Sequence, residues 1–320
     1  MDPQGSPAPS LNPRKSLRRL LWTALKVLVS TGLLSIVIEK TGFAKILSTL
    51  GGISIPLFLT SSALYTFSLY ISSIRWRLLL PGGFTLGRLF SLYLIGSFFN
   101  TLLPGIIGGD AVKAYYLYKD TGKGTPAVAS VFMDRYIGFA ALMCVGTAAF
   151  PFSVRYFKGS PIEWLFPLIV LLFALGSILA YALRAGRRFR FIAEVYEYFD
   201  RYVTKRGTVA KTFSLSMFVQ IINIVSVYLL IIGLDIDLPF LPLLIFIPII
   251  TTISTIPISI SGLGVREASF ILLFHFLGVG PVQATAISFA WFLTIATGSL
   301  PGLIEYLRHP SANRPVSQQF

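Results

Sequence analysis

Long apolar runs constrain the fold of this chain more than any other feature of its sequence. Stretches of roughly 20 apolar residues recur, which is the length of an α-helix that crosses the ~30 Å hydrocarbon core of a bilayer. Charged residues make up only 12% of the 320 residues, about half of the roughly 25% usual in soluble domains, and the mean hydropathy is +0.75. This composition excludes a disordered chain and argues against a soluble enzyme. The sequence predicts an all-α, polytopic helical membrane protein.

The apolar stretches give a provisional count of membrane segments. The first follows a basic stretch but has no small-x-small cleavage site after it, so we interpret it as a retained anchor and not as a signal peptide. We interpret residues 89–107 and 239–279 as re-entrant hairpins, which leaves about six full spans. The candidate stretches are 20–38, 55–74, 89–107, 126–150, 162–183, 212–233, 239–260, 268–279 and 282–305.

The net charge of +14 is arranged as a topology signal. With the hairpins placed as above, segments on one side of the membrane carry 20 Lys and Arg residues, and segments on the other side carry four. Positive residues accumulate on the cytoplasmic side. We therefore expect a multi-pass protein of the cell (inner) membrane, with residues 1–19 and 306–320 as cytoplasmic tails. The basic residues favour contact with anionic lipid headgroups, and we expect no nucleic-acid partner.

Two breaks in the hydrophobic pattern carry most of the functional information. They are NTLLPGIIGGDAVK at 100–113 and STIPISISGLGVRE at 254–267, each with Pro and paired Gly followed by charge and a resumed helical pattern. Irregular backbone at membrane depth persists only where it is buried in protein or lines a wet cavity. Two such segments predict a polar cavity. The alternative is a pair of Gly/Pro kinks that serve helix packing alone.

The spacing of these breaks indicates an internal repeat. From Ile55 to Gly109 is 54 residues and from Thr212 to Gly264 is 52, while the breaks precede Phe150 and Glu305 by 41 residues each. The two halves, 55–150 and 212–305, start on opposite sides of the membrane. Inverted repeats with broken helices are the architecture of secondary transporters. Residues 184–211 between them predict an amphipathic, cytoplasmic linker helix.

Specific motifs resemble a known family. The stretches LLPGIIGGDAVKAYYL, SVFMDRYIGFAAL and ISGLGVREASF resemble the transmembrane region of lysylphosphatidylglycerol synthases and their stand-alone, flippase-like relatives. The resemblance covers most of residues 20–305, and implies the handling of anionic phospholipids, aminoacylated phospholipids or polyprenyl-linked lipids. Full-length synthases carry an additional aminoacyl-transfer domain. About 15 residues follow the last span here, so we do not expect aminoacyl transfer from tRNA.

Charges inside the predicted spans are candidates for the site. Asp134 and Arg135 lie eight and nine residues into the span that starts at Pro126, about 12–13 Å deep, where unpaired charge is costly and usually faces a cavity. We expect Arg135 to face Asp110 or a lipid phosphate, and Asp134 to meet Lys113 or Arg266. The alternative is structural ion pairing between hairpin and span.

The residues that follow each break complete the candidate headgroup site. Arg266 and Glu267 open the helix after the second break, where free N–H groups and an arginine suit a phosphate, and Lys113 has the corresponding place after the first. Glycines would let the backbone approach a headgroup closely. We assign headgroup binding to Arg135, Arg266, Lys113, Gly108, Gly109, Gly262 and Gly264, and charge pairing or gating to Asp110, Asp134 and Glu267.

Three functions fit these features. The first is a flippase-like transporter of an anionic phospholipid or a polyprenyl-phosphate-linked lipid, independent of ATP because no phosphate-binding loop is present. The second is a membrane transferase acting on a lipid phosphate, with Asp134 or Asp110 as base. The third is a non-catalytic scaffold for envelope lipid or glycan assembly. One Cys and two His leave too few ligands for a transition-metal site, and we expect no cofactor. The expected partners are membrane lipids, and the sequence does not indicate the oligomeric state.

Overall fold

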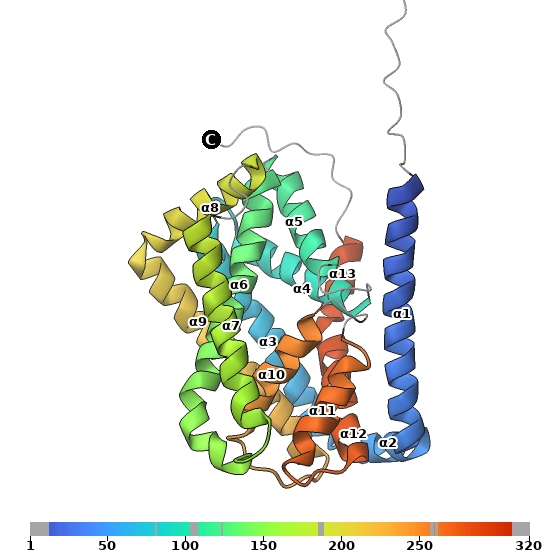
Figure 1. Cartoon of the computed structure of the whole chain (residues 1–320). Coiled ribbons are helices and arrows are strands. Elements are labelled where there is room, and N and C mark those ends of the chain that lie inside the picture. The colour runs from blue at the N-terminus through green and yellow to red at the C-terminus, as the bar shows by residue number, and fades with distance from the viewer. Residues whose placement is uncertain are drawn as a thin grey trace, which may run out of the picture.

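The protein is helical throughout the part of the chain that can be described. The computed structural model describes residues 13–80, 82–102, 108–122, 124–184, 189–256, 259 and 262–308. Within these ranges there is no strand, which confirms the all-α prediction (Figure 1). The elements are α1 (Pro13–Thr41), α2 (Phe43–Gly51), α3 (Ile55–Leu79), α4 (Leu86–Leu102), α5 (Gly108–Thr121), α6 (Gly124–Ser153), η1 (Val154–Tyr156), α7 (Ile162–Leu183), α8 (Arg190–Val203), α9 (Arg206–Gly233), α10 (Leu243–Thr255), α11 (Val265–His275), α12 (Pro281–Ser299) and α13 (Pro301–Arg308).

Five helices of the described chain are long and apolar enough to cross a bilayer: α3, α6, α7, α9 and α12, with α6 extended by η1 and α12 by α13. A sixth span results if Val27–Thr41 and the bent α2, at 78° to it, count together. This agrees with the six spans expected. The predicted tails 1–19 and 306–320 fall largely outside the described residues, while residues 13–19 begin α1 and residues 306–308 end α13.

Two pairs of shorter helices flank the predicted breaks. α4 and α5 have 17 and 14 residues, and α10 and α11 have 13 and 11, so each is about 16–26 Å long and shorter than a ~30 Å core. The arms of each pair pack against each other, as in a hairpin. Residues 103–107 of the first break, and 257, 258, 260 and 261 of the second, lie outside the described residues. The predicted bounds of the first hairpin were wrong: residues 108–121 form its second arm and are not a surface segment.

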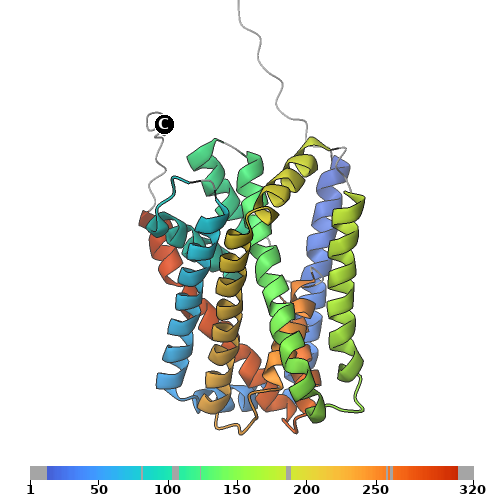
Figure 2. The ribbon, with the colours of Figure 1, turned by 90° about the vertical axis from the view of Figure 1, so that its left-hand side faces the viewer.

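The two halves repeat the same packing with opposite direction. In the first half α3 contacts α4, α4 contacts α5 and α5 contacts α6; in the second half α9, α10, α11 and α12 make the same successive contacts. Between the halves, α3 contacts α9, α6 contacts α9 and α10, and α12 contacts α3 and α4. Figures 1 and 2 show α3 running up beside a descending α9, with α4 and α5 in the upper part and α10 and α11 in the lower part. This is an inverted-topology repeat, the arrangement of many transporters.

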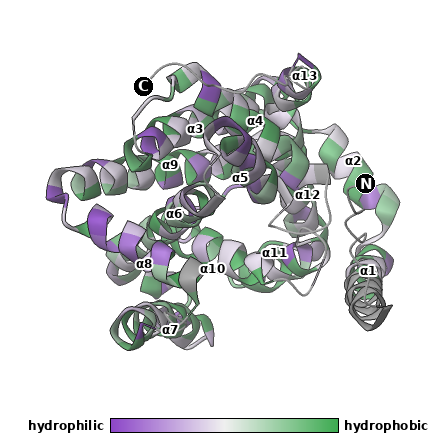
Figure 3. Ribbon diagram, turned by 90° about the horizontal axis from the view of Figure 1, so that it is seen from above, coloured by the Kyte–Doolittle hydropathy of each residue, from purple (hydrophilic) through white to green (hydrophobic). Residues whose placement is uncertain are grey.

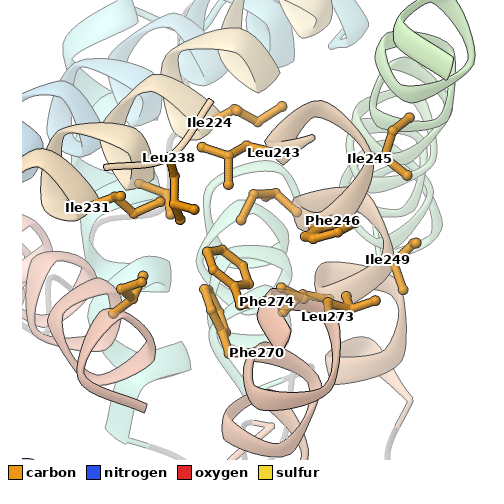
Figure 4. Close-up of a cluster of buried hydrophobic side chains, with 14 of the residues drawn as sticks. Ile224, Ile231, Leu238, Leu243, Ile245, Phe246, Ile249, Phe270, Leu273 and Phe274 are labelled. Carbon is orange, nitrogen blue, oxygen red and sulfur yellow. The ribbon is translucent and has the colours of Figure 1, made fainter. Parts of the chain in front are cut away.

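Apolar side chains hold the second half together. Figure 4 shows the cluster in which side chains of α9, α10 and α11 meet, including the fully buried Phe246, Phe270 and Phe274. A second buried cluster joins α3, α4 and α6 around Trp76 and Met133. At the periphery, α7 has only 6% of its apolar window buried, and Figure 3 shows α1 and α7 at the rim, where hydrocarbon would cover them.

The predicted linker helix is α8, and it packs against the protein with its aromatic residues. The Tyr198 hydroxyl donates a hydrogen bond to the Leu79 carbonyl of α3, and burial raises the pKa of Tyr198 above its usual value. Phe199 packs against Tyr136 of α6, with ring centroids 6.1 Å apart. The linker therefore packs directly on α3 and α6 of the first half, in addition to the membrane-surface position that its amphipathic pattern predicts.

Small residues allow the first hairpin to close. A Cβ on Gly109 of α5 would lie 1.7 Å from the carbonyl oxygen of Gly96 in α4, and a Cβ on Gly96 would lie 2.7 Å from Cγ of Lys113. The Asn100 Oδ1 accepts a hydrogen bond from the Gly109 N–H at 2.8 Å, which satisfies one free donor at the start of α5. This contact positions the charged residues of α5.

Replacing Gly109 by Ala is expected to destabilise the hairpin by about 1–3 kcal/mol or more, because the new methyl group has no space between α4 and α5. Gly176→Ala is the matched control, since Gly176 lies inside α7 and a Cβ added there would have no neighbouring atom within 4 Å. The control is expected to leave the midpoint of thermal unfolding in detergent unchanged or slightly raised. Equal midpoints for the two variants would contradict the close packing of α4 on α5.

Candidate functional site

A cavity of about 650 Å³ lies where the two halves meet. It is lined by residues of α3, α4, α5 and α6 from the first half, by α9 and α10 from the second, and by one residue of α7. Its charged lining residues come from three helices of the first half: Arg75, Asp110, Lys113, Asp134 and Arg135. The predicted polar cavity is therefore present, with its ionic groups on one side.

Arg75 and Asp134 form the buried base of this ionic cluster. The Arg75 Nε donates to Oδ1 of Asp134 at 2.8 Å, and Nη1 donates to the Ser216 hydroxyl of α9 at 2.9 Å. The Tyr93 hydroxyl donates to Oδ2 of the same carboxylate. Arg75 is 5% exposed and Asp134 1%, so both charges depend on these partners for compensation.

Lys113 joins the two carboxylates of the cluster. Its Nζ lies 3.2 Å from Oδ1 of Asp110 and 3.9 Å from Oδ2 of Asp134. The ammonium also lies over the Tyr93 ring, 4.0 Å from the centroid, which is a favourable cation–π distance. Lys113 is 2% exposed, so this cation lies inside the fold.

Arg135 is the accessible cation of the cluster. Its Nε donates to Oδ2 of Asp110 at 2.6 Å and its Nη2 donates to Oδ1 at 3.2 Å. This bidentate ion pair links α6 to the first turn of α5. Unlike the other cations, its side chain is 52% exposed. This places a guanidinium partly open to the cavity, beside a carboxylate that Lys113 also holds.

The ionic cluster is not neutral. Three cations face two carboxylates, which leaves one positive charge among the described lining residues. Neutral polar side chains of the second half complete the lining, among them Gln220 and Asn223 of α9 and Thr251 and Thr255 of α10. A monoanion with polar substituents, such as a phosphate diester, matches this combination. No group of three or more His, Cys, Asp or Glu suited to a metal occurs among the described residues.

The structure brings some of the predicted contacts together. Arg135 faces Asp110, one of the two partners expected for it. Asp134 lies near Lys113 as expected, but its closest cation is Arg75, which the sequence reading left outside the site. The expected approach of Arg266 to Asp134 is wrong: Arg266 binds Glu267 at 2.7 Å and Ser288 at 3.0 Å instead.

Arg266 and Glu267 form a separate buried network at the start of α11. Glu267 Oε2 accepts the Gly264 N–H at 2.6 Å, while its Oε1 binds both Arg266 and Ser288. This network closes the helix end and joins α11 to α12, and none of its residues is among the described lining of the cavity. Glu267 pairs with Arg266, whereas a headgroup role for Arg266 stays a prediction.

The four candidate glycines lie at close helix contacts. Gly108 and Gly109 begin α5, and Gly109 packs on Gly96. Gly262 and Gly264 have positive φ values of 76° and 81°, and a Cβ on Gly264 would lie 2.6 Å from Cβ of Leu33 in α1. In the described structure they serve turns and close packing, and their predicted approach to a headgroup stays a prediction.

Arg75 and Tyr93 are the residues that sequence reasoning missed. Arg75 was counted as cytoplasmic because the apolar stretch was ended at residue 74, whereas α3 continues to Leu79. The available signal was the apolar and aromatic sequence on both sides of Arg75, which extends the helix beyond it. Nothing in the sequence distinguishes Tyr93 from the other aromatic residues of the same stretch.

Comparison with known proteins gives two findings. Residues 23–302 match the family described as "Lysylphosphatidylglycerol synthase TM region". A curated protein of Methanothermobacter thermautotrophicus, named "UPF0104 membrane protein", is 26% identical over 288 residues, which cover 77% of this chain and 81% of that protein. The family match extends over the two halves and the cavity between them.

Removing Arg75 tests the cost of its buried partner. We expect Arg75→Leu to destabilise the protein by about 3–5 kcal/mol, because Asp134 would keep only the distant Lys113 as a cation. The double variant Arg75→Leu/Asp134→Leu should recover part of that loss. Unfolding in detergent by heat or by increasing SDS measures both.

The matched control is Arg88→Leu, which removes a pair with Asp120 whose side chains are about a quarter exposed. Such a pair contributes about 0–1 kcal/mol. Equal losses of stability for Arg75→Leu and Arg88→Leu would contradict the conclusion that removing Arg75 leaves Asp134 as a buried carboxylate without a close cation.

Proposed function

The chain belongs to the family of the lysylphosphatidylglycerol synthase TM region, and from that premise we propose that it binds an anionic lipid headgroup in the cavity between its halves and moves it across the membrane without hydrolysing ATP. The family is the one that the sequence motifs indicated. It makes the chain a multi-pass membrane protein, and the identity of the ligand is inferred from the chemistry of the cavity.

The observation that carries the proposal is the excess positive charge of the cavity. Charge within a membrane domain is costly unless paired or hydrated, and it usually lines a pathway. Here two cations would suffice to neutralise Asp110 and Asp134, yet Arg75, Lys113 and Arg135 are all present. An anionic headgroup supplies the missing negative charge. The lipid is an anionic phospholipid or a polyprenyl phosphate, since both present a phosphate.

Arg135 is the first contact for the phosphate in this mechanism. Because its guanidinium is half exposed and bound to Asp110, an incoming phosphate would compete with that carboxylate for the same donors. Lys113 keeps Asp110 compensated when Arg135 turns to the lipid. Binding would thus weaken one of the two ion-pair links between the first hairpin and α6, while Lys113 keeps its contact with Asp134.

The inverted repeat supplies the two states that transport requires. In such folds the broken helices of each half open alternately around a fixed site. The α4–α5 hairpin carries Asp110 and Lys113, and the α10–α11 hairpin contributes Thr251 and Thr255 to the lining of the cavity. Net movement follows the lipid gradient or the membrane potential, which is worth ~2.3 kcal/mol per charge at 100 mV. We place the protein in the inner membrane with cytoplasmic termini, following the distribution of Lys and Arg.

The transferase alternative receives less support from the site. Its base would be Asp134 or Asp110, and each of these carboxylates already accepts donors from two cationic side chains. A carboxylate held in this way is poorly placed to accept a proton from a substrate. The ionic cluster is better suited to binding than to acid–base catalysis.

Scrambling of a fluorescent phosphatidylglycerol in proteoliposomes tests the proposal. Wild type should expose the label to an external quencher faster than empty vesicles, and Arg135→Gln should lower that rate at least tenfold because it removes the accessible cation. Arg155→Gln is the matched control, since Arg155 is exposed at the end of α6 and outside the described lining.

The control should retain the wild-type rate, and thermal unfolding should show that both variants are folded. Wild-type protein that moves neither phosphatidylglycerol nor a polyprenyl phosphate faster than empty vesicles would overturn the proposed function. Equal rates for wild type and Arg135→Gln would overturn the role of Arg135.

A further inference from the structure

One face of α6 carries both a cation and a row of apolar rings. Phe132 and Tyr136 are four residues apart, as are Arg135 and Phe139, and Leu142 follows Phe139 by three residues, which places all five on one side of the helix. All five line the same cavity. From Arg135 to Leu142 the helix rises about 10 Å, and no other charged residue occurs on this part of the face.

Helix α7 continues the apolar wall of this part of the cavity through one residue, Phe173. Phe173 lines it as well, with its ring centroid 5.0 Å from that of Phe139 and 5.6 Å from that of Tyr136. α7 is the most lipid-exposed of the five spans, with 6% of its window buried, and Figure 3 shows it at the rim of the molecule. The wall is therefore next to bulk hydrocarbon.

The two helices touch closely at one end of this region. A Cβ on Gly146 of α6 would lie 2.4 Å from Cζ of Phe166 in α7, so the helices have no space between them there. One turn before Gly146, Leu142 lines the cavity, and the lining continues along α6 to the half-exposed Arg135. The apolar lining of α6 therefore ends where α6 meets α7 near Gly146 and reaches the ionic cluster at its other end.

We infer that this α6–α7 groove, formed by Tyr136, Phe139, Leu142 and Phe173, holds a hydrocarbon chain of the lipid whose phosphate binds at Arg135. The inference rests on the proposed function and adds to it a site for the tail. Charge complementarity fixes the polar end at Arg135, and the apolar wall beyond it suits an acyl or prenyl chain.

Photolabelling with competition tests this inference. The probe is phosphatidylglycerol with a diazirine in its acyl chain, present in trace amount in phosphatidylcholine proteoliposomes of the full chain. After irradiation, peptide mass spectrometry should find label at residues 136–142, and excess unlabelled phosphatidylglycerol should lower that labelling at least fivefold. Label at the exposed Leu172 and Leu175 of α7 should not compete, because these residues contact bulk lipid.

A groove-filling variant gives a second measurement. Leu142→Trp should lower the competed labelling at least fivefold, while Leu175→Trp, the same change on the exposed side of α7, should leave it unchanged. If Leu142→Trp does not fold, the competition experiment on the wild-type protein still tests the inference.

The outcomes separate the two proposals. Labelling at 136–142 that does not compete, in protein that moves phosphatidylglycerol in an Arg135-dependent way, would overturn the groove alone. Competed labelling in protein that moves no lipid would support the groove as a lipid site and overturn transport. Competition at Leu172 and Leu175 as strong as at 136–142 would also overturn a distinct groove.

Discussion

The buried ion pair of Arg75 with Asp134 is the interaction on which the site depends. Neither charge is tolerated alone inside a membrane domain, so the pair requires α3 and α6 to meet in one relative orientation. Lys113 then connects the pair to Asp110, and Asp110 connects to Arg135. Ion pairs thereby connect α3, α5 and α6 of the first half, and one positive charge is left facing the cavity.

The inverted repeat and its glycines make that network possible. The helices α4 and α5 are each too short to cross a ~30 Å hydrocarbon core, and their hairpin brings Lys113 of α5 within 3.9 Å of Asp134 of α6. The hairpin arms close together because Gly96 and Gly109 carry no side chain where they meet. In the second half, Arg266 forms its hydrogen bonds and ion pair with the nearby Glu267 and Ser288. This half contributes neutral hydroxyl and amide groups to the cavity. The two halves therefore share a backbone plan and differ in electrostatics.

Much of this was accessible from the sequence, for identifiable physical reasons. Apolar runs and Gly/Pro breaks gave the spans and hairpins, because their lengths and backbone preferences are local properties. The contact of Arg135 with Asp110 was one of two alternatives expected, because a charge inside a span needs a partner or a wet cavity. Arg75 was missed since hydropathy marks where an apolar run ends and does not mark where the helix ends. Arg266 was misplaced because the direction of a side chain around a helix, and the pairing of adjacent Arg and Glu residues, depend on tertiary packing.

The central claim is that the excess cation of the cavity is satisfied by the phosphate of a lipid. Mass spectrometry of the lipids that remain with the purified protein tests it most directly, with wild type and Arg135→Gln prepared side by side. The account predicts that wild type retains an anionic phospholipid or polyprenyl phosphate enriched over the surrounding membrane, and that Arg135→Gln loses this enrichment. Lipids in the same proportions as the membrane in both preparations would contradict it.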